Sequence, residues 1–447
     1  MEIRDKHVLV VGLARSGISA ANLLSKLGGK VTVTDEKGEG ELSENIRRLE
    51  RGILLKLGGH DEVDIEEVDL AVISPGVVWY SPFLHKMRER GIRIISEVEL
   101  AFQHMQLPFI AVTGTNGKTT TTTLTGEMLR RGGKRVFVGG NIGNPLCDGV
   151  LNGDKYELIL SEISTFQMEG IETFKPHIGV LLNITPDHLD RHRDMEEYRE
   201  LKKRVFINQD NNDYTVLNLD DVVTAGLSHE GKGKKVFFSR LRETENGVFV
   251  RGGKIIFKMD GREEEVCPLD ELKLIGVHNI ENILASVAVG MLYNVSVKCM
   301  RDAISGFRGL NHRMEFVREI QGVKFINDSK GTNVGATVKS LQSFNGPIIL
   351  IAGGKDKGSD YHPMKGLIEE RVKFLILIGD ARKKIASLMN GFKNMIEADS
   401  LEKAVKEAFS RSKSGDVVLL SPACSSFDMF RDYEDRGEQF RKIVESL

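Results

Sequence analysis

Short apolar runs that end at small or polar residues recur along the N-terminal part of the chain. Val8–Val11 runs into a glycine-containing turn, Val31–Thr34 ends at Asp35, and Leu70–Ile73 ends at Ser74. The residues between the first two runs are rich in Ala and Leu, which favours a helix there. Strands that alternate with helices are typical of a parallel, doubly wound sheet. We therefore expect the chain to begin with a domain of this kind.

The same alternation begins again twice, near residue 107 and near Gly309. The apolar runs of these two later segments are Ile110–Val112, Leu158–Leu160, Ile178–Leu182, Lys324–Ile326, Ile348–Ile351, Phe374–Ile378 and Val417–Leu420. At 447 residues the chain is also too long for one ordinary core. The pattern predicts three domains, 1–106, 107–308 and 309–447.

Residues 214–266 follow a different pattern, in which glycines and charged residues join short β-prone pieces. These pieces are Val236–Phe238, Gly247–Val250 and Ile255–Lys258. They predict a small antiparallel sheet at the periphery of the central domain, followed by a helix from about Asn279 to Leu292. The expected fold class is α/β, with a Rossmann-like N-terminal domain, a phosphate-loop ATPase-like central domain and a Rossmann-like C-terminal domain.

Composition narrows the class of protein. Hydrophobic residues make up 40% of the chain and charged residues 28%, which is typical of a soluble globular protein. The net charge of -2 gives no broad basic surface for nucleic acid. No apolar run is long enough to span a membrane, and the charged N-terminus does not resemble a signal peptide. The four scattered cysteines indicate neither a disulfide framework nor a zinc site. We expect a cytoplasmic protein that binds no nucleic acid and inserts into no membrane.

The run Gly114-Thr-Asn-Gly-Lys-Thr-Thr120 follows an apolar strand and has the composition of a nucleoside triphosphate site. Its two glycines permit a tight turn whose amides point at phosphate oxygens, at the positive end of the helix that follows. In such a loop Lys118 reaches the β- and γ-phosphates, and the Thr119 hydroxyl binds magnesium. We expect ATP to be bound by Gly114, Thr115, Asn116, Gly117, Lys118, Thr119 and Thr120.

Carboxylates and a histidine follow two other apolar runs of the central segment. Glu162 follows one of them, and Asp187-His188 and Asp190-Arg191 follow the other. Magnesium takes oxygen ligands, so Glu162 suits a first ion beside Thr119 and the phosphates. The Pro-Asp-His loop makes His188 a candidate for a second ion.

Two further features leave alternatives open. Gly12–Gly17 is a variant dinucleotide fingerprint with Ala14 at its second glycine, and Asp35 lies where an acidic residue binds a ribose. This turn suits a nicotinamide cofactor, a nucleotide carried on a substrate, or a purely structural role. The chain has no other nicotinamide-type cluster, which favours the substrate nucleotide. Asn279 and Asn282 share one helix face, where they read an adenine edge or cap the helix.

Four polar loops of the third segment carry lysine, hydroxyl and amide side chains at predicted strand ends. They are Asn311–Arg313, Asn327–Asn333, Gly353–Lys357 and Ser421–Ser426. Lysines together with hydroxyls suit an anionic co-substrate.

Taken together, these motifs resemble the Mur ligases, and the resemblance runs the whole length of the chain. The superfamily shares the shorter phosphate loop in which Val112 replaces the first glycine of the common pattern. The runs Asn327-Asp-Ser-Lys-Gly-Thr-Asn333 and Ser421-Pro-Ala-Cys-Ser-Ser-Phe-Asp-Met-Phe430 are similar to those of the D-glutamate-adding members. The resemblance implies a monomeric, ATP-dependent ligase that joins D-glutamate to UDP-N-acetylmuramoyl-L-alanine through an acyl phosphate, releasing ADP and phosphate, in cytoplasmic peptidoglycan precursor synthesis.

The resemblance also implies roles for individual residues. Contacts to the UDP-substrate fall on Ser16, Asp35, Glu36, Ser74 and Asn141. Catalytic positions are Lys118, Glu162, His188 and Lys202, and two Mg²⁺ ions fall on Thr119, Glu162, His188 and carbamylated Lys202. Further ATP contacts fall on Asn279, Arg313 and Asp328. D-glutamate contacts fall on Lys330, Thr332, Lys357, Ser426 and Tyr433, the last of which is often Phe in the family.

Spacing alone gives Lys202 no chemical role, because it predicts a solvated lysine on the charged helix Met195–Arg204. Only the resemblance makes Lys202 a metal ligand. Because three domains carry the three substrates, we expect hinge motion of the third domain near residues 307–312.

Three other functions remain alternatives. A folylpolyglutamate synthetase-like ligase shares the ATP loop and the glutamate chemistry. A dinucleotide-dependent oxidoreductase, which belongs to a different class, rests on Gly12–Gly17 alone. A non-catalytic nucleotide-binding module is disfavoured by the set Glu162, His188 and Lys202.

Overall fold

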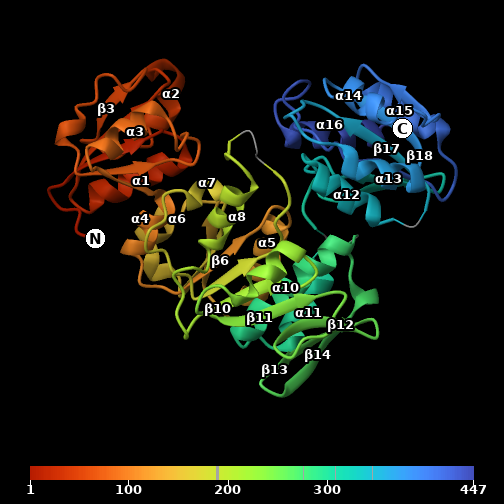
Figure 1. The fold of residues 1–447 in the computed structure, drawn as a ribbon, viewed down its shortest axis with the longest axis horizontal. Helices are drawn as coiled ribbons and strands as arrows, with labels where there is room; N and C mark the ends of the chain where they lie inside the picture. The colour runs from red at the N-terminus through yellow and green to blue at the C-terminus, as the bar shows by residue number, and fades with distance from the viewer. Residues whose placement is uncertain (188–190, 275, 308, 345) are drawn as a thin grey trace. The chain divides into compact units, whose positions relative to one another are not determined.

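Three β-sheets carry the fold of the computed structural model, which describes residues 1–187, 191–274, 276–307, 309–344 and 346–447 (Figure 1). The chain divides into two compact units. The first unit comprises Met1–Ile184, Arg191–Cys267 and Ile283–Ala303. The second comprises Pro268–Asn282, Ile304–Leu447 and the described residues just after Ile184.

The first sheet is fully parallel, with the strand order β3-β2-β1-β4-β5. Its strands are β1 (His7–Val11), β2 (Lys30–Asp35), β3 (Leu54–Leu57), β4 (Leu70–Ile73) and β5 (Arg93–Ser96). Its helices are α1 (Arg15–Lys26), α2 (Glu39–Ile46), α3 (Pro82–Glu89) and α4 (Glu97–His104). All residues of β1 after His7 are buried, as expected for a central strand that is covered on both faces. The order reverses between β1 and β4, and ligands bind beyond the carboxyl ends of strands at such a point.

The second sheet has nine strands in the order β14-β13-β12-β11-β10-β9-β6-β8-β7. These are β6 (Phe109–Thr113), β7 (Val136–Gly140), β8 (Leu158–Glu162), β9 (Ile178–Leu181), β10 (Tyr214–Asn218), β11 (Lys234–Ser239), β12 (Gly247–Arg251), β13 (Lys254–Met259) and β14 (Arg262–Pro268). The associated helices are α5 (Lys118–Arg131), α6 (Leu146–Leu151), α7 (Thr165–Met168), α8 (Met195–Lys203), α9 (Val222–Gly226), α10 (Val277–Leu292) and α11 (Val297–Gly306). Short 3₁₀ helices lie at Ile65–Glu67, Gly153–Lys155, Leu227–His229 and Leu269–Glu271.

The β-rich region predicted at 214–266 is part of this same sheet. β10 pairs in parallel with β9 and β11, and β11 pairs in parallel with β12. Antiparallel pairing begins at the β12–β13 hairpin. The expectation of a separate peripheral sheet is corrected in this respect, because the sheet is mixed and continuous.

The third sheet has the order β15-β16-β20-β17-β18-β19. Its strands are β15 (Glu315–Ile320), β16 (Val323–Asn327), β17 (Ile348–Gly353), β18 (Val372–Ile378), β19 (Met395–Glu397) and β20 (Val417–Leu420). Its helices are α12 (Val334–Gln342), α13 (His362–Arg371), α14 (Arg382–Leu388), α15 (Leu401–Arg411) and α16 (Tyr433–Glu445). Along β17, Ile348 and Leu350 enter one apolar cluster while Ile349 and Ile351 enter another, so both faces of this sheet are covered.

Only β15 is antiparallel to its neighbour in this sheet, and this explains the position of one predicted loop. Glu315 at the start of β15 pairs with Asn327 at the end of β16. The loop 311–313 therefore precedes a strand rather than following one, which corrects the sequence interpretation. It nevertheless lies at the carboxyl edge of the sheet, beside the loop that follows β16.

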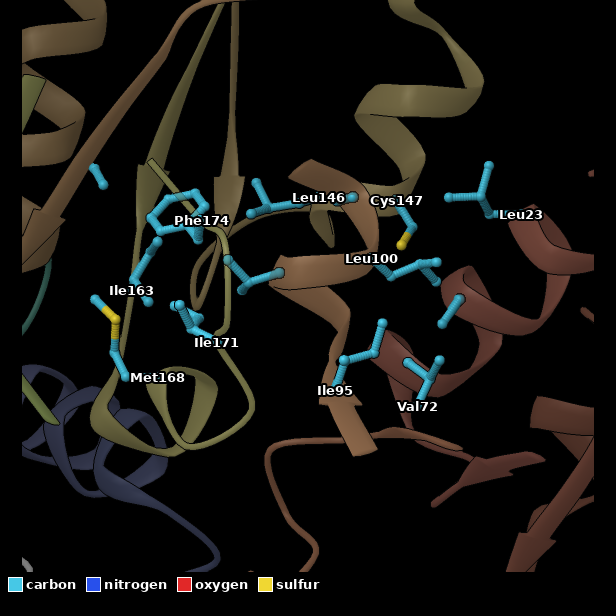
Figure 2. Packing of buried hydrophobic residues seen from close by; sticks show 14 of the residues in the cluster. Leu23, Val72, Ile95, Leu100, Leu146, Cys147, Ile163, Met168, Ile171 and Phe174 are labelled. Carbon is cyan, nitrogen blue, oxygen red and sulfur yellow. The ribbon is translucent and has the colours of Figure 1, made fainter. Parts of the chain in front are cut away.

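The first two sheets share one cluster of buried apolar side chains (Figure 2). Leu23 and Val72 of the first sheet layer belong to it, as does Phe174 beyond β8. Leu100 of α4 and Leu146 of α6 lie between them (Figure 2). Because this core is continuous, the first compact unit contains both sheets.

The expected fold class is confirmed, since the chain forms three mainly parallel sheets covered by helices. Among the residues that the structure describes, no helix has the length and apolarity that crossing a bilayer requires.

Candidate active site

The predicted phosphate loop connects β6 to α5, and two glycines give it its shape. Gly114 has φ of 151° and Gly117 has φ of 88°, in the region that glycine tolerates best. A Cβ atom at Gly114 would lie 2.9 Å from Cβ of Leu182, so a side chain there would also clash. Gly117 is the N-cap of α5, which places the loop at the positive end of that helix.

Asn183, which follows β9, braces the phosphate loop. Its Oδ1 accepts a hydrogen bond of 2.8 Å from the amide of Asn116, and its Nδ2 donates one of 3.1 Å to the carbonyl of Asn116. Its own carbonyl accepts from the amide of Thr115 at 3.0 Å. Asn183 is not among the residues predicted from the sequence, although a polar residue directly after a buried strand was an available signal.

Lys118 folds back over the phosphate loop. Its Nζ donates hydrogen bonds of 2.8 Å to the carbonyl oxygens of Gly114 and Thr115. These contacts hold the ammonium group beside the loop amides, where a positive charge favours an anionic ligand.

Glu162 is the last residue of β8 and pairs with Val112 of β6. Its Oε1 accepts a 2.7 Å hydrogen bond from Nδ2 of Asn141, while its Oε2 is buried without a hydrogen-bond partner among the described residues. A buried oxygen in this state costs about 1–3 kcal/mol unless a cation or donor compensates it. A hard carboxylate oxygen near the hydroxyl-bearing start of α5 is the donor type that Mg²⁺ takes, so these residues fit a magnesium ion.

Lys202 is buried, with 1% of its surface exposed, although it lies on the charged helix α8. Its Nζ lies 4.5 Å from the centroid of the Tyr198 ring. The Tyr198 hydroxyl in turn is 3.1 Å from Oγ1 of Thr115 in the phosphate loop. The interpretation of Lys202 as a solvated-face residue was wrong, because α8 turns this side chain toward the interior.

His188 lies outside the described residues.

A second group of predicted residues lies at the carboxyl ends of β1, β2 and β4 of the first sheet. The Ser74 hydroxyl donates a 2.8 Å hydrogen bond to the carbonyl of Gly12. The Asp35 carboxylate accepts from the amides of Leu13 at 2.7 Å and Lys37 at 2.9 Å. Ser74 and Asp35 therefore hold the glycine-rich turn in place.

The remaining residues predicted around this turn differ in exposure. A Cβ atom at Gly17 would lie 1.9 Å from the carbonyl oxygen of Gly12, so Gly17 is required by the fold itself. Ser16 is half-buried in the first turn of α1, and Glu36 is exposed. Asn141 is held by Glu162 on the second sheet.

Asp328, in the second unit, is buried at the carboxyl edge of the third sheet. Its Oδ2 accepts hydrogen bonds from the hydroxyls of Ser340 at 2.7 Å and Ser421 at 2.8 Å. Its Oδ1 accepts from the amide of Met314 at 3.3 Å. Burial raises the pKa of Asp328 to about 6, while these hydrogen bonds and Arg313 oppose the rise. The carboxyl group thereby joins its own loop to Ser421 after β20 and to Met314, which directly follows the loop 311–313.

Asn279 lies inside the first turn of α10, which begins at Val277. It lies inside the helix rather than at the N-cap position, and its contact with ATP stays a prediction. Its side chain is 5% exposed, and its Oδ1 accepts a 3.3 Å hydrogen bond from Nδ2 of Asn282.

The structure brings together part of the predicted D-glutamate set. Nζ of Lys330 lies 3.5 Å above the centroid of the Tyr433 ring, a close cation–π contact. The amide of Thr332 donates to the carbonyl of Lys330 at 2.7 Å. Ser426 is buried, whereas Lys357 is exposed on its loop.

Arg436 of α16 is a buried residue that the sequence does not predict. Its guanidinium donates to Oγ and the carbonyl of Ser329 at 2.9 and 2.8 Å, and to the carbonyls of Cys424 at 3.2 Å and Ser425 at 3.3 Å. Burial lowers its pKa to about 10. Arg436 thereby joins the loop after β16 to the loop after β20, and these two loops carry Lys330 and Ser426. An arginine in a charged helix gives no sequence signal for this role.

Known protein families match the three parts of the chain in order. Residues 6–96 match the Mur ligase MurD-like N-terminal domain, residues 112–290 the Mur ligase middle domain, and residues 312–424 the Mur ligase glutamate ligase domain.

Curated relatives match over the full length. The chain is 49% identical to the UDP-N-acetylmuramoylalanine--D-glutamate ligase of Geobacter metallireducens, covering 100% of this chain and 99% of that protein. It is 44% identical to the protein of the same name from Thermoanaerobacter pseudethanolicus, covering 100% of both.

Solved structures share the fold at low sequence identity. MurF ligase from Thermotoga maritima in complex with ADP has a TM-score of 0.61 at 19% identity, covering 100% of this chain and 96% of that one. A pseudomurein peptide ligase type C from Methanothermus fervidus has a TM-score of 0.60 at 21% identity, covering 99% and 100%. With three domain matches in order and full-length relatives near half identity, the chain belongs to the Mur ligase family.

Proposed function

We propose that this protein is the ATP-dependent ligase that adds D-glutamate to UDP-N-acetylmuramoyl-L-alanine in peptidoglycan precursor synthesis. The observation that carries the proposal is the full-length match, at 49% identity, to a ligase of that name. The phosphate loop with Lys118 and the buried Glu162 supplies the matching chemistry. ATP and the UDP-substrate support a cytoplasmic reaction, and we expect the protein to act as a monomer.

The reaction proceeds in two steps. The carboxylate of the alanyl substrate attacks the γ-phosphorus of ATP, and ADP leaves, which gives an acyl phosphate. The amine of D-glutamate then attacks the acyl carbon, phosphate leaves, and the amine loses a proton as the amide forms. Both steps gather negative charge on oxygen, so Lys118 and the loop amides stabilise their transition states.

We propose that two Mg²⁺ ions are held by Thr119, Glu162, His188 and a carbamylated Lys202. The ions supply positive charge that neutralises the phosphates during transfer. Oε2 of Glu162, which has no hydrogen-bond partner in the described part of the chain, supports this, as does the burial of Lys202 close to the phosphate loop. Carbamylation turns a buried cation into an anionic oxygen ligand, which a hard metal requires.

We propose three functional domains, 1–106, 107–308 and 309–447. The first binds the UDP part of the substrate through Ser16, Asp35, Glu36 and Ser74, with Asn141 nearer the sugar. The second binds ATP through residues 114–120 and Asn279. The third contributes Arg313 and Asp328 to ATP, and holds D-glutamate through Lys330, Thr332, Lys357, Ser426 and Tyr433.

Phosphate release from ATP tests the proposal. The purified protein is given UDP-N-acetylmuramoyl-L-alanine with D-glutamate, L-glutamate, L-lysine or diaminopimelate in separate reactions. We expect release with D-glutamate alone. Release with another amino acid, or without the UDP-substrate, contradicts the assignment.

Two other functions are tested in the same preparation. A folate substrate replaces the UDP-substrate to test the folylpolyglutamate synthetase alternative. NADH titration against the fluorescence of Trp79, the single tryptophan, tests the oxidoreductase alternative. Trp79 lies on the loop that follows β4, and its carbonyl accepts a 2.9 Å hydrogen bond from Nη2 of Arg88.

A further inference from the structure

Arg191 binds the loop that follows β4. Its Nη1 donates to the carbonyl of Gly76 at 3.4 Å, and its Nη2 donates to the carbonyl of Val77. The side chain is 17% exposed. A single guanidinium thus holds two successive carbonyls of a loop that is more than a hundred residues away in the sequence.

Two side chains from the α7 segment fix the orientation of Arg191. The guanidinium carbon lies 4.1 Å from the centroid of the Phe166 ring, and Nη2 lies 3.6 Å from Oε2 of Glu169. Phe166 lies on α7, and Glu169 is its C-cap. This helix begins shortly after Glu162, so Arg191 is anchored to the segment that follows the candidate metal ligand.

The loop held by Arg191 shapes the candidate UDP site. The amide of Val77 donates to the carbonyl of Ser74 at 3.0 Å, and Ser74 in turn holds Gly12. A Cβ atom at Gly12 would lie 3.1 Å from Cγ2 of Val77 and 3.0 Å from Cβ of Ser74. The close approach of Val77 to Gly12 therefore limits how far the loop after β4 can shift relative to the turn after β1.

A packed path leads from the other side of Arg191 to the phosphate loop. The Phe166 ring stacks on His192 with centroids 5.5 Å apart, and the His192 ring lies 5.4 Å from that of Tyr198. His192 Nε2 is 2.9 Å from Oγ1 of Thr165. The Tyr198 hydroxyl reaches Thr115 of the phosphate loop. Contacts are therefore continuous from Gly12 to Thr115 within the first compact unit.

We propose that Arg191 is a positioning residue that holds the UDP-substrate loops in register with the phosphate loop. This inference rests on the proposed function, because it concerns how the substrate carboxylate meets the γ-phosphate of ATP. Transfer between bound groups is sensitive to displacements of about 1 Å, so a fixed distance between the two loops matters for the rate. Arg191 acts through Gly76 and Val77 and need not touch the substrate.

The test compares Arg191→Met with the wild-type enzyme. We expect the KM for UDP-N-acetylmuramoyl-L-alanine to rise about tenfold to a hundredfold, as for the loss of a charged hydrogen-bond donor, with a fall in kcat. The KM values for ATP and D-glutamate should stay within about twofold, since Arg191 holds neither of their candidate sites. Isothermal calorimetry should show the same rise in Kd for the UDP-substrate and an unchanged Kd for ADP.

Two further variants separate positioning from general stability. Arg191→Lys keeps the cation over Phe166 but cannot hold two carbonyls in a fork, so its KM should lie between those of wild type and Arg191→Met. Arg371→Met is a matched control in the second unit, where Arg371 donates to the carbonyls of Leu341, Gln342 and Phe344. It should lower the melting temperature and leave the KM for the UDP-substrate unchanged.

Several results would overturn the inference. An unchanged KM and Kd for the UDP-substrate in both Arg191 variants would do so, and so would an equal rise in the KM values of all three substrates. If Arg191→Met fails to fold, Arg191→Lys and Glu169→Gln carry the same test, because Glu169 orients the guanidinium. Wild-type protein without D-glutamate-dependent phosphate release would overturn the proposed function instead, and calorimetry of the UDP-substrate would still test the role of Arg191.

Discussion

The amide group of Asn141 satisfies one oxygen of the Glu162 carboxylate at 2.7 Å and leaves the other oxygen buried without a partner among the described residues. The main-chain N–H of Asn141 also donates a hydrogen bond of 2.8 Å to the main-chain carbonyl of Glu162. Two hydrogen bonds therefore fix the direction in which the partnerless oxygen points. Partners of this kind orient a metal ligand and are often as important as the ligand itself.

Loss of either residue should weaken use of magnesium. Glu162→Gln removes the charge, and we expect kcat to fall roughly a hundredfold or more, since metal sites depend on each charged ligand. Asn141→Ala keeps the Glu162 carboxylate but removes a hydrogen bond that orients it. The Mg²⁺ concentration that gives the half-maximal rate should therefore rise about 10- to 100-fold. Rates measured across a Mg²⁺ titration check both. An unchanged Mg²⁺ requirement in Asn141→Ala would contradict the arrangement.

Lys202→Ala should lose most activity, and a short carboxylic acid in the buffer should restore part of it. The acid supplies the oxygen ligand that a carbamate would provide. Initial rates with increasing acid concentration measure the rescue. The neighbouring Lys203 is a matched control, because it pairs with Glu200 and Glu230. Lys203→Ala should keep near-normal activity and show no rescue; full activity of Lys202→Ala without acid would exclude the carbamate.

Glu97 should make stability depend on pH. Burial raises its pKa from the ordinary 4.5 to about 7, against hydrogen bonds from Cys147. Between these values the unfolded chain has released the proton and the folded protein has kept it. The unfolding free energy therefore falls as pH rises from about 4.5 to 7, by about 3 kcal/mol for this group, and stays level above that range.

Urea unfolding of Glu97→Gln and wild type at pH 5, 6, 7 and 8 checks this dependence. The variant should gain stability relative to wild type as pH rises, because its side chain has no proton to lose. Glu44→Gln, a change of an exposed carboxylate, is the control and should follow wild type. A constant difference between Glu97→Gln and wild type over this range would refute the assignment.

Arg436→Met should weaken D-glutamate binding. The guanidinium joins the loops that carry Lys330 and Ser426, so its loss should raise the KM for D-glutamate about tenfold or more. The single ammonium group of a lysine cannot reach the acceptors of both loops at once. Arg436→Lys should therefore not restore the wild-type KM for D-glutamate. Arg431, whose side chain is 81% exposed just before α16, is the control position. Equal KM values for D-glutamate in Arg436→Met and Arg431→Met would contradict this role.

Substrate binding should compact the molecule. The phosphate loop and the candidate D-glutamate residues belong to different compact units, so we expect a hinge motion when the substrates bind. Small-angle scattering with nucleotide and UDP-substrate should give a smaller radius of gyration than the protein alone. No change with both ligands bound would argue against a hinge near residues 307–312.

Local features of the site could be predicted from the sequence, and tertiary ones could not. Gly114 and Gly117 can be identified from the sequence because a positive φ depends mainly on the residue type at that one position. Glu162 is found because a carboxylate after an apolar run lies at a strand end. The burial of Lys202 and Arg436 depends on which elements cover α8 and α16, and no helix pattern contains that information.

The continuation of the second sheet was missed for a similar reason. Short strands separated by glycines and charged residues predict an antiparallel meander. In the structure the short helix α9 (Val222–Gly226) connects β10 to β11 and lets these two strands run in parallel. Asn183 was missed because its role depends on β9 lying next to β6. Pairing between distant strands is a property of the whole fold.

The apolar cluster shared by the first two sheets has a consequence for how the protein unfolds. A cut between residues 106 and 107 would strip cover from Leu100 on one side and from Leu146 on the other, leaving both fragments with exposed core. The two sheets should therefore melt in one cooperative transition, with the third sheet free to melt in another. The proposed boundary at 106 falls inside one compact unit, so it does not separate two folding units.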